Sequence, residues 1–278
     1  MFTVGRPSRA SILITYGVGF LALLLFLFPI FWMVMTSFKN TGQAFTSSPV
    51  WFFRPTLNNY REVLVERNFL HYLGNSILVG IIATLATLIL AVSIAYPLAR
   101  YNPKGEQQIT SWILSLRIIP PIVSVIPLYI LFSHLKLIDQ YPALIIMYTF
   151  MNLPLAVWML RGFFAEIPRE LEEASLVDGN NPIGTFFRVV LPLVAPGLVS
   201  TGMLALIFCW NEFLFANVLT AARAKTAPVG LTEYATPTGV LWTQIMAAGT
   251  VVVLPVLVAG VFIQRYLVRG LAAGAVKG

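Results

Sequence analysis

Long apolar runs separated by short polar connections dominate this sequence. Six runs have about the 20 residues that a helix needs to cross the hydrocarbon layer of a membrane. In chain order they cover residues 11–38, 75–100, 109–132, 141–163, 195–219 and 245–267. The pattern predicts an all-α membrane protein with six transmembrane helices.

The first run could also be a signal peptide, because Arg6 and Arg9 precede it. Its apolar stretch is much longer than the about 7–15 residues of a signal peptide, and no clear small-residue cleavage site follows. We therefore expect a retained first helix. Lys and Arg concentrate on the cytoplasmic side of membrane proteins. If the amino terminus is cytoplasmic, the residues that lie there close to helix ends include Arg6, Arg9, Arg100, Lys104, Arg265 and Arg269. With six helices, both termini are then cytoplasmic.

Composition supports a membrane environment. Hydrophobic residues make up 58% of the chain, charged residues 10%, and the mean hydropathy is +0.82. A soluble domain carries about a quarter charged residues, so a cytosolic enzyme, a disordered protein and a disulfide scaffold are excluded. The formal charge of +7 comes from basic residues beside apolar runs, which favours membrane lipid over nucleic acid as a partner. Cys209, His71 and His134 form no metal-ligand cluster in the sequence, so we expect no metal site and interpret the histidines as interfacial.

Proline interrupts several of the predicted spans, most sharply at Pro120–Pro121. Each proline removes a backbone donor and tends to kink or break a helix. The pair is compatible with a helix kinked for packing and with a helix bent around a passage. The connections at residues 40–74 and 221–243 are predicted to lie outside the cell, the first with a short helix near residues 60–67. Either could touch an external partner or be inert.

The stretch from Glu166 to Arg188 is the most densely charged part of the chain. Pro168 suits a helix start, and Gly179 suits a helix end in the left-handed conformation. Asn181 and Pro182 suit the cap and first position of a second helix. The stretch therefore predicts a helix–turn–helix, which on these signals alone could be an ordinary amphipathic connector.

The residues of this stretch also resemble a known motif. Glu173-Ala174-Ser175, three residues, Gly179, nine residues, Val189, one residue and Leu191-Pro192 resemble the EAA loop of ABC importer permeases. Ser175 and Val189 depart from the family's Ala and Ile. Trp210-Asn211-Glu212-Phe213, Arg117 before Pro120-Pro121, and the end of the chain through Gly278 are similar to the maltose-permease-like smaller subunit of the carbohydrate importers.

The resemblance implies a type I ABC importer transmembrane domain. It divides the chain into an amino-terminal helix with an outward loop (residues 1–74), a permease core (75–267) with the cytoplasmic EAA loop at about 166–192, and a cytoplasmic tail (268–278) that could contact the ATPase subunits. It implies a bacterial inner-membrane protein whose partners are a second homologous permease, two ATP-binding cassette subunits and an extracytoplasmic solute-binding protein. The EAA residues would contact the ATPase subunit. The sequence has no phosphate-binding loop of the type Gly-x-x-x-x-Gly-Lys-Ser/Thr, so ATP and Mg would be bound by that subunit and no cofactor by this one.

Arg117 and Glu212 are ionisable residues inside predicted spans, where charges are costly and often functional. They could line a solute passage, or they could form an interhelical ion pair with each other or with the partner permease; the sequence favours the ion pair. Asn152, Trp210 and Asn211 are further candidates for the passage. The predicted function is ATP-driven import of a sugar or sugar-like solute, with an ion-driven secondary transporter as the alternative. A membrane enzyme is disfavoured because no catalytic cluster is evident.

Overall fold

The computed structural model describes residues 9–44, 46, 48–101, 103–237 and 239–275. These residues are mainly helical, and the chain divides into two compact units. Unit 1 comprises Met1–Phe69 and Glu233–Val253, and unit 2 comprises Leu70–Thr232 and Leu254–Gly278. Residues 276–278 of the predicted carboxyl tail lie outside the described residues.

Unit 1 contains one long helix and several short elements. They are α1 (Arg9–Ser37), α2 (Thr41–Ala44), α3 (Asn58–Arg61), η1 (Glu62–Glu66), β1 (Ala235–Thr236), β2 (Gly239–Val240) and the start of α13 (Trp242–Ala275). The two strands pair antiparallel, and η4 (Leu231–Tyr234) leads into them. Asn59 ties α3 to the end of α1 by donating hydrogen bonds to the carbonyls of Ser37 and Lys39. The short helix predicted near residues 60–67 is confirmed as α3 and η1.

Lys39, directly after α1, is buried against aromatic rings. Its side chain is 2% exposed, and Nζ lies 4.5 Å from the ring centroid of Trp32. Burial lowers the pKa of Lys39 below its usual value. The ring face attracts the ammonium group and compensates part of its lost hydration.

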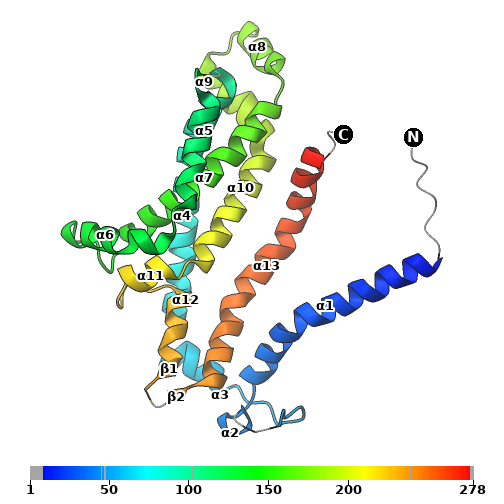
Figure 1. Cartoon of the computed structure of the whole chain (residues 1–278), viewed down its shortest axis with the longest axis vertical. Helices are drawn as coiled ribbons and strands as arrows, with labels where there is room; N and C mark the ends of the chain where they lie inside the picture. Colours follow the sequence, from blue (N-terminus) through cyan, green and yellow to red (C-terminus); the bar gives the residue numbers. More distant parts are fainter. Residues whose placement is uncertain (1–8, 45, 47, 102, 238, 276–278) are drawn as a thin grey trace. The chain divides into compact units, whose positions relative to one another are not determined.

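Unit 2 is built on three long helices that lie alongside one another (Figure 1). They are α4 (Phe69–Tyr101), α7 (Tyr141–Glu166) and α10 (Leu191–Asn211). The other elements are α5 (Glu106–Ser115), η2 (Leu116–Ile118), α6 (Pro121–His134), α8 (Arg169–Val177), α9 (Pro182–Thr185), η3 (Phe186–Val190), α11 (Leu214–Leu219) and α12 (Ala227–Gly230). Figure 1 shows α8 and α9 at one end of the long helices and α6 projecting away from them.

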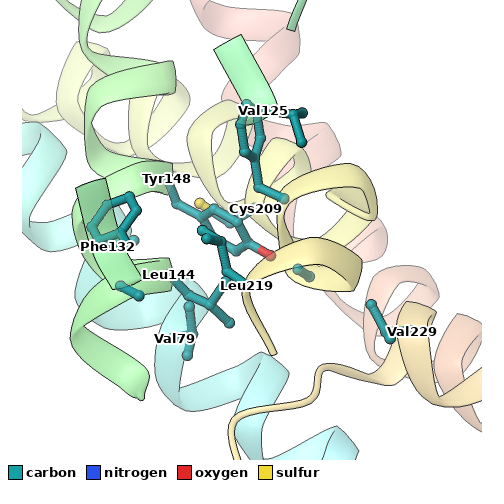
Figure 2. Packing of buried hydrophobic residues seen from close by; sticks show 12 residues of the cluster. Val79, Val125, Phe132, Leu144, Tyr148, Cys209, Leu219 and Val229 are labelled. Carbon is teal, nitrogen blue, oxygen red and sulfur yellow. The ribbon is translucent and has the colours of Figure 1, made fainter. Parts of the chain in front are cut away.

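Two apolar clusters hold unit 2 together. One joins the second half of α4 to α7 and α10 through Ala95, Val157, Leu160 and Val194. The other joins α4, α6, α7, α10 and α11, and Figure 2 shows the Tyr148 ring and Cys209 inside it. Because helices from several parts of the chain share each cluster, the interior of unit 2 depends on long-range packing.

Four helices are long and apolar enough to cross a membrane: Ile12–Ser37, Phe69–Tyr101, Tyr141–Glu166 and Pro182–Asn211. A fifth candidate is the pair Glu106–Ile118 and Pro121–His134, which is bent by 87°. For α13, the described apolar part is the shorter stretch Trp242–Val258. The described residues therefore show a multi-pass membrane protein, and the sixth span stays a prediction.

The bend between η2 and α6 has a local cause. Ile119 and Pro120 have ψ angles of 121° and 124°, outside the helical range. A residue before proline is sterically pushed out of the helical conformation, and here two successive residues precede a proline. The helix therefore stops, and Pro121 begins α6 as its first residue.

The predicted fifth span is displaced in the structure. The sequence predicted residues 195–219, whereas the continuous helix runs over Pro182–Asn211 and α11 is a separate helix. Glu212 breaks the helix with a ψ of 125°. The apolar run continues past this break, so hydropathy alone missed it.

Candidate functional site

The helix–turn–helix predicted from residues 166–188 is present as α8 and α9. Pro168 precedes α8 directly, and Gly179 ends it with a φ of +90°. The backbone N–H groups of Gly179 and Asn180 donate to the carbonyls of Leu176 and Ser175, which closes the end of the helix. Asn181 caps α9 by accepting a hydrogen bond from the backbone N–H of Gly184 at 2.7 Å. The local predictions for Gly179, Asn181 and Pro182 are confirmed. We call residues 166–192 the α8–α9 hairpin.

Ser175 joins the two helices of the hairpin. Its Oγ lies 3.0 Å from Thr185 Oγ1 and accepts a hydrogen bond from Asn180 Nδ2 at 3.1 Å. Both Ser175 and Thr185 are buried. The departure from alanine at this motif position therefore supplies a polar contact inside the hairpin.

The hairpin also presents apolar side chains to its surroundings. Glu173, Ala174 and Gly179 are exposed. Around them Leu176, Val177 and Ile183 are 45%, 86% and 70% exposed. Apolar side chains grouped on an exposed surface indicate an interaction site. The remaining motif residues continue into the next helix: Val189 lies in η3, a π-helical turn, and Leu191 and Pro192 begin α10.

A second candidate site is a cavity of about 490 Å³ beside the bend between η2 and α6. Its polar lining includes Arg117, Asn152 and Glu212, and its apolar lining includes Phe208 and Met151. Three of the five predicted passage residues therefore line one cavity. Trp210, which is buried, and Asn211, which is exposed, are not among its lining residues.

The predicted Arg117–Glu212 ion pair is wrong. The Arg117 guanidinium lies over the Phe208 ring, 4.5 Å from its centroid. Glu212 instead accepts hydrogen bonds from the backbone N–H groups of Phe215 at 2.8 Å and Ala216 at 3.0 Å. The first turn of α11 thus stabilises the Glu212 carboxylate, because a helix start has unpaired N–H donors. Both residues also lie at breaks rather than deep inside spans. Contact of either residue with a partner permease stays a prediction.

Asn152 is held by its own helix and its neighbour. It is 5% exposed, and Nδ2 donates to the carbonyl of Tyr148 at 2.9 Å and to Cys209 Sγ at 3.4 Å. Its amide therefore has a fixed orientation on the cavity wall between α7 and α10.

Sequence reasoning missed Asp139, which organises the connection after α11. Its carboxylate accepts the backbone N–H groups of Ala221, Ala222, Arg223 and Ala224 at 3.0–3.2 Å. Burial alone would raise the pKa of Asp139, but these four donors outweigh it and lower the pKa to about 2. The available signal was weak, because an Asp in a short connection is common and its partners lie more than 80 positions away.

The start of α4 holds the same connection from another side. Asn75 Nδ2 donates to the carbonyls of Arg223 and Lys225, and His71 Nε2 lies 3.0 Å from the Arg223 carbonyl. Ser76 Oγ accepts the backbone N–H of Ala227 at 2.8 Å. His71 therefore makes a loop contact, and within the described residues no group of three or more His, Cys, Asp or Glu side chains could hold a metal ion.

Long apolar helices, a bent span and an exposed hairpin describe a multi-pass membrane protein. Residues 87–273 match the family described as "Binding-protein-dependent transport system inner membrane component". The chain belongs to this family: it is an ABC transporter permease of the carbohydrate type and not an enzyme.

Named relatives cover nearly the whole chain. The sulfoquinovosyl glycerol transport system permease protein SmoH of Agrobacterium fabrum is 37% identical over 282 residues, which is 100% of this chain and 96% of the relative. The trehalose/maltose transport system permease protein MalG of Thermococcus litoralis is 37% identical over 91% of this chain and 92% of the relative. The diacetylchitobiose uptake system permease protein DasC of Streptomyces coelicolor is 37% identical over 90% of this chain and 92% of the relative.

Solved structures show the same fold at lower identity. A chain of a bacterial ABC transporter involved in the import of the acidic polysaccharide alginate superposes with a TM-score of 0.76, at 23% identity over 95% of this chain and 99% of that chain. A second chain comes from an alginate transporter in complex with an alginate pentasaccharide-bound periplasmic protein. It gives a TM-score of 0.65 at 16% identity over 92% of this chain and 95% of that chain.

Proposed function

We propose that this chain is the transmembrane subunit of an ATP-driven importer for a sugar or sugar-like solute in the bacterial inner membrane. Its α8–α9 hairpin lies in the cytoplasm with both termini and docks on a separate ATPase subunit that binds ATP and Mg. A second homologous permease completes the pore, and a binding protein delivers the solute from outside. The solutes named for the relatives, which are trehalose, maltose, diacetylchitobiose and a sulfoquinovosyl glycerol, support the sugar class.

The observation that carries this proposal is the contrast between the buried polar contact inside the hairpin and the apolar side chains that the hairpin exposes. Ser175 and Thr185 hold its interior together, whereas Leu176, Val177 and Ile183 are exposed. A rigid element with an exposed apolar surface can transmit force to or from a partner. It can do so only if its contacts with that partner differ between two states of the transporter.

Crosslinking tests the docking. Cys209 is the only cysteine in the chain, so a Cys209→Ser background carrying Val177→Cys has one reactive thiol. In the assembled complex, a thiol-specific photocrosslinker at position 177 should capture the ATPase subunit. Leu57→Cys, at an exposed position of the predicted outward loop, is the matched control and should not capture it.

Two results would contradict the proposal. One is labelling of position 177 from outside intact cells by a membrane-impermeant maleimide. The other is solute exchange by the isolated chain in liposomes without any ATPase subunit, which would favour the secondary transporter. If neither result is obtained, uptake assays of the complete complex with each of the four named solutes define which of them is carried.

A further inference from the structure

Two consecutive glutamates on α8, Glu172 and Glu173, differ in how far their side chains are exposed to solvent. Glu173, the first residue of the motif, is exposed, whereas the Glu172 side chain is only 15% exposed. Successive residues of a helix point about 100° apart, and Glu172 is the one of the two that pairs with α4.

Glu172 is paired with the last turn of α4. Arg100 Nε lies 2.5 Å from Glu172 Oε1, and the Arg100 side chain is 7% exposed. Arg100 Nη1 also donates to the carbonyl of Ile167 at 2.9 Å, directly before α8. Arg169 Nη2 donates back to the Arg100 carbonyl at 3.1 Å. One residue of α4 is therefore bonded to three positions at the start of the hairpin.

Tyr96, one turn earlier on α4, completes this arrangement. Its OH donates to Glu172 Oε2 at 2.9 Å. Its ring lies 5.4 Å from Phe164 of α7 and 4.9 Å from Phe186 of η3, measured between ring centroids. The Glu172 carboxylate is thus held on both oxygens by a helix that is itself packed against the two neighbouring spans.

A largely buried ion pair resists separation, because removing either partner leaves an uncompensated charge away from water. Movement of the hairpin therefore carries the end of α4 with it more easily than it breaks the pair. Within the part of the chain that the structure describes, the ion pair that joins the hairpin to α4 lies at the base of the hairpin, so we place the attachment there.

We propose that Tyr96, Arg100 and Glu172 form a clamp that transmits movement of the α8–α9 hairpin to α4, with Arg100 and Glu172 as positioning residues. The clamp rests on the proposed function, since it needs an ATPase subunit on the hairpin. It requires no contact between the clamp residues and ATP, solute or the ATPase subunit.

A spin label on α4 tests the clamp without knowledge of the solute. Ser93 is exposed one turn before Tyr96, so Ser93→Cys in the Cys209→Ser background carries the label. In the complete complex, MgATP should change the mobility of the label. Glu172→Gln should reduce this change at least fivefold while the ATPase subunits copurify at the parent yield. The exchanged pair Arg100→Glu with Glu172→Arg should restore at least half of the change.

Glu170→Gln, an exposed acidic position on the same helix, is the matched control and should behave as the parent. If Glu172→Gln fails to assemble, Tyr96→Phe is the variant that tests the clamp, because it removes only one hydroxyl group. It should still halve the MgATP-dependent change in the mobility of the label. A full response in Glu172→Gln or Tyr96→Phe, or no recovery in the exchanged pair, would overturn the clamp alone. Failure of the parent chain to retain an ATPase subunit would instead overturn the proposed function, and the clamp with it.

Discussion

Asp139 accepts the backbone N–H of Ala224 at 3.0 Å, across 85 positions of the sequence. Three further N–H groups of the same connection bind the carboxylate and help lower its pKa to about 2 from its usual value of 3.8. A group with a lowered folded-state pKa contributes stability above its unfolded pKa and loses it as the pH falls through the folded pKa. The contribution of Asp139 should therefore be complete above about pH 4 and vanish near pH 2.

Asp139→Asn tests this dependence. At pH 6 the free energy of unfolding of the variant should be about 1 kcal/mol lower than that of the parent. This is less than the full pKa shift of Asp139 corresponds to, because solvent screens the partly exposed carboxylate. The difference from the parent in thermal unfolding of the detergent-solubilised protein should shrink between pH 4 and pH 2. Asp178→Asn, on the exposed hairpin, is the control. A difference that stays constant with pH would contradict the assignment.

Gly197 lets α10 approach α7 closely. A Cβ at this position would overlap the Phe163 ring, with Cδ2 only 2.7 Å away. Gly197→Ala should therefore destabilise the packing of these helices by about 1–3 kcal/mol, the usual cost of overpacking. Thermal unfolding in detergent measures this loss. Gly162→Ala, where a Cβ would meet nothing within 4 Å, should stay within about 0.5 kcal/mol of the parent.

Glu212 should matter through the start of α11. Glu212→Ala removes the acceptor of the Phe215 and Ala216 N–H groups and should lower the free energy of unfolding by about 1–2 kcal/mol. The yield of the complex or the uptake of solute should fall accordingly. Glu212→Gln retains one acceptor oxygen and should have a smaller effect. Parent levels of complex and uptake in Glu212→Ala would remove this residue from the functional site.

Gly179 should tolerate few replacements, because its φ of +90° is a conformation that side chains disfavour. Gly179→Ala should destabilise the hairpin by about 1 kcal/mol and reduce ATP-dependent uptake. Gly179→Asn should be milder, since asparagine enters left-handed conformations more readily. Deletion of residues 173–179 should abolish uptake while the spans still insert. Full uptake by the deletion variant would refute a coupling role.

The sequence predicted the hairpin well because its signals are local. Gly179, Asn181 and Pro182 each determine the conformation of their own turn, and the structure confirms all three. Predictions that needed a partner in space were weaker. Charge alone suggests an ion pair of Arg117 and Glu212 with each other or with the partner permease. In the structure, Glu212 instead accepts backbone N–H groups at the start of α11, and Arg117 lies over the Phe208 ring.

Hydropathy likewise located the apolar runs but not their breaks. The run through Glu212 stays apolar on both sides, so only the backbone geometry separates α10 from α11. The contacts of Asp139 and Arg100 were beyond sequence reasoning for a related reason. Each residue bonds mainly to groups whose position depends on how distant segments pack.

The two prolines at the 87° bend also affect the main chain of Arg117. A helical carbonyl at residue 117 would receive its N–H from residue 120 or 121, and both are proline without an N–H. Arg117 lines the cavity with a cationic side chain, and its main-chain oxygen therefore receives no N–H from either proline. The bend thus separates the hydrogen bonding of Arg117 from that of a regular helix, which is a direct consequence of placing two prolines in succession.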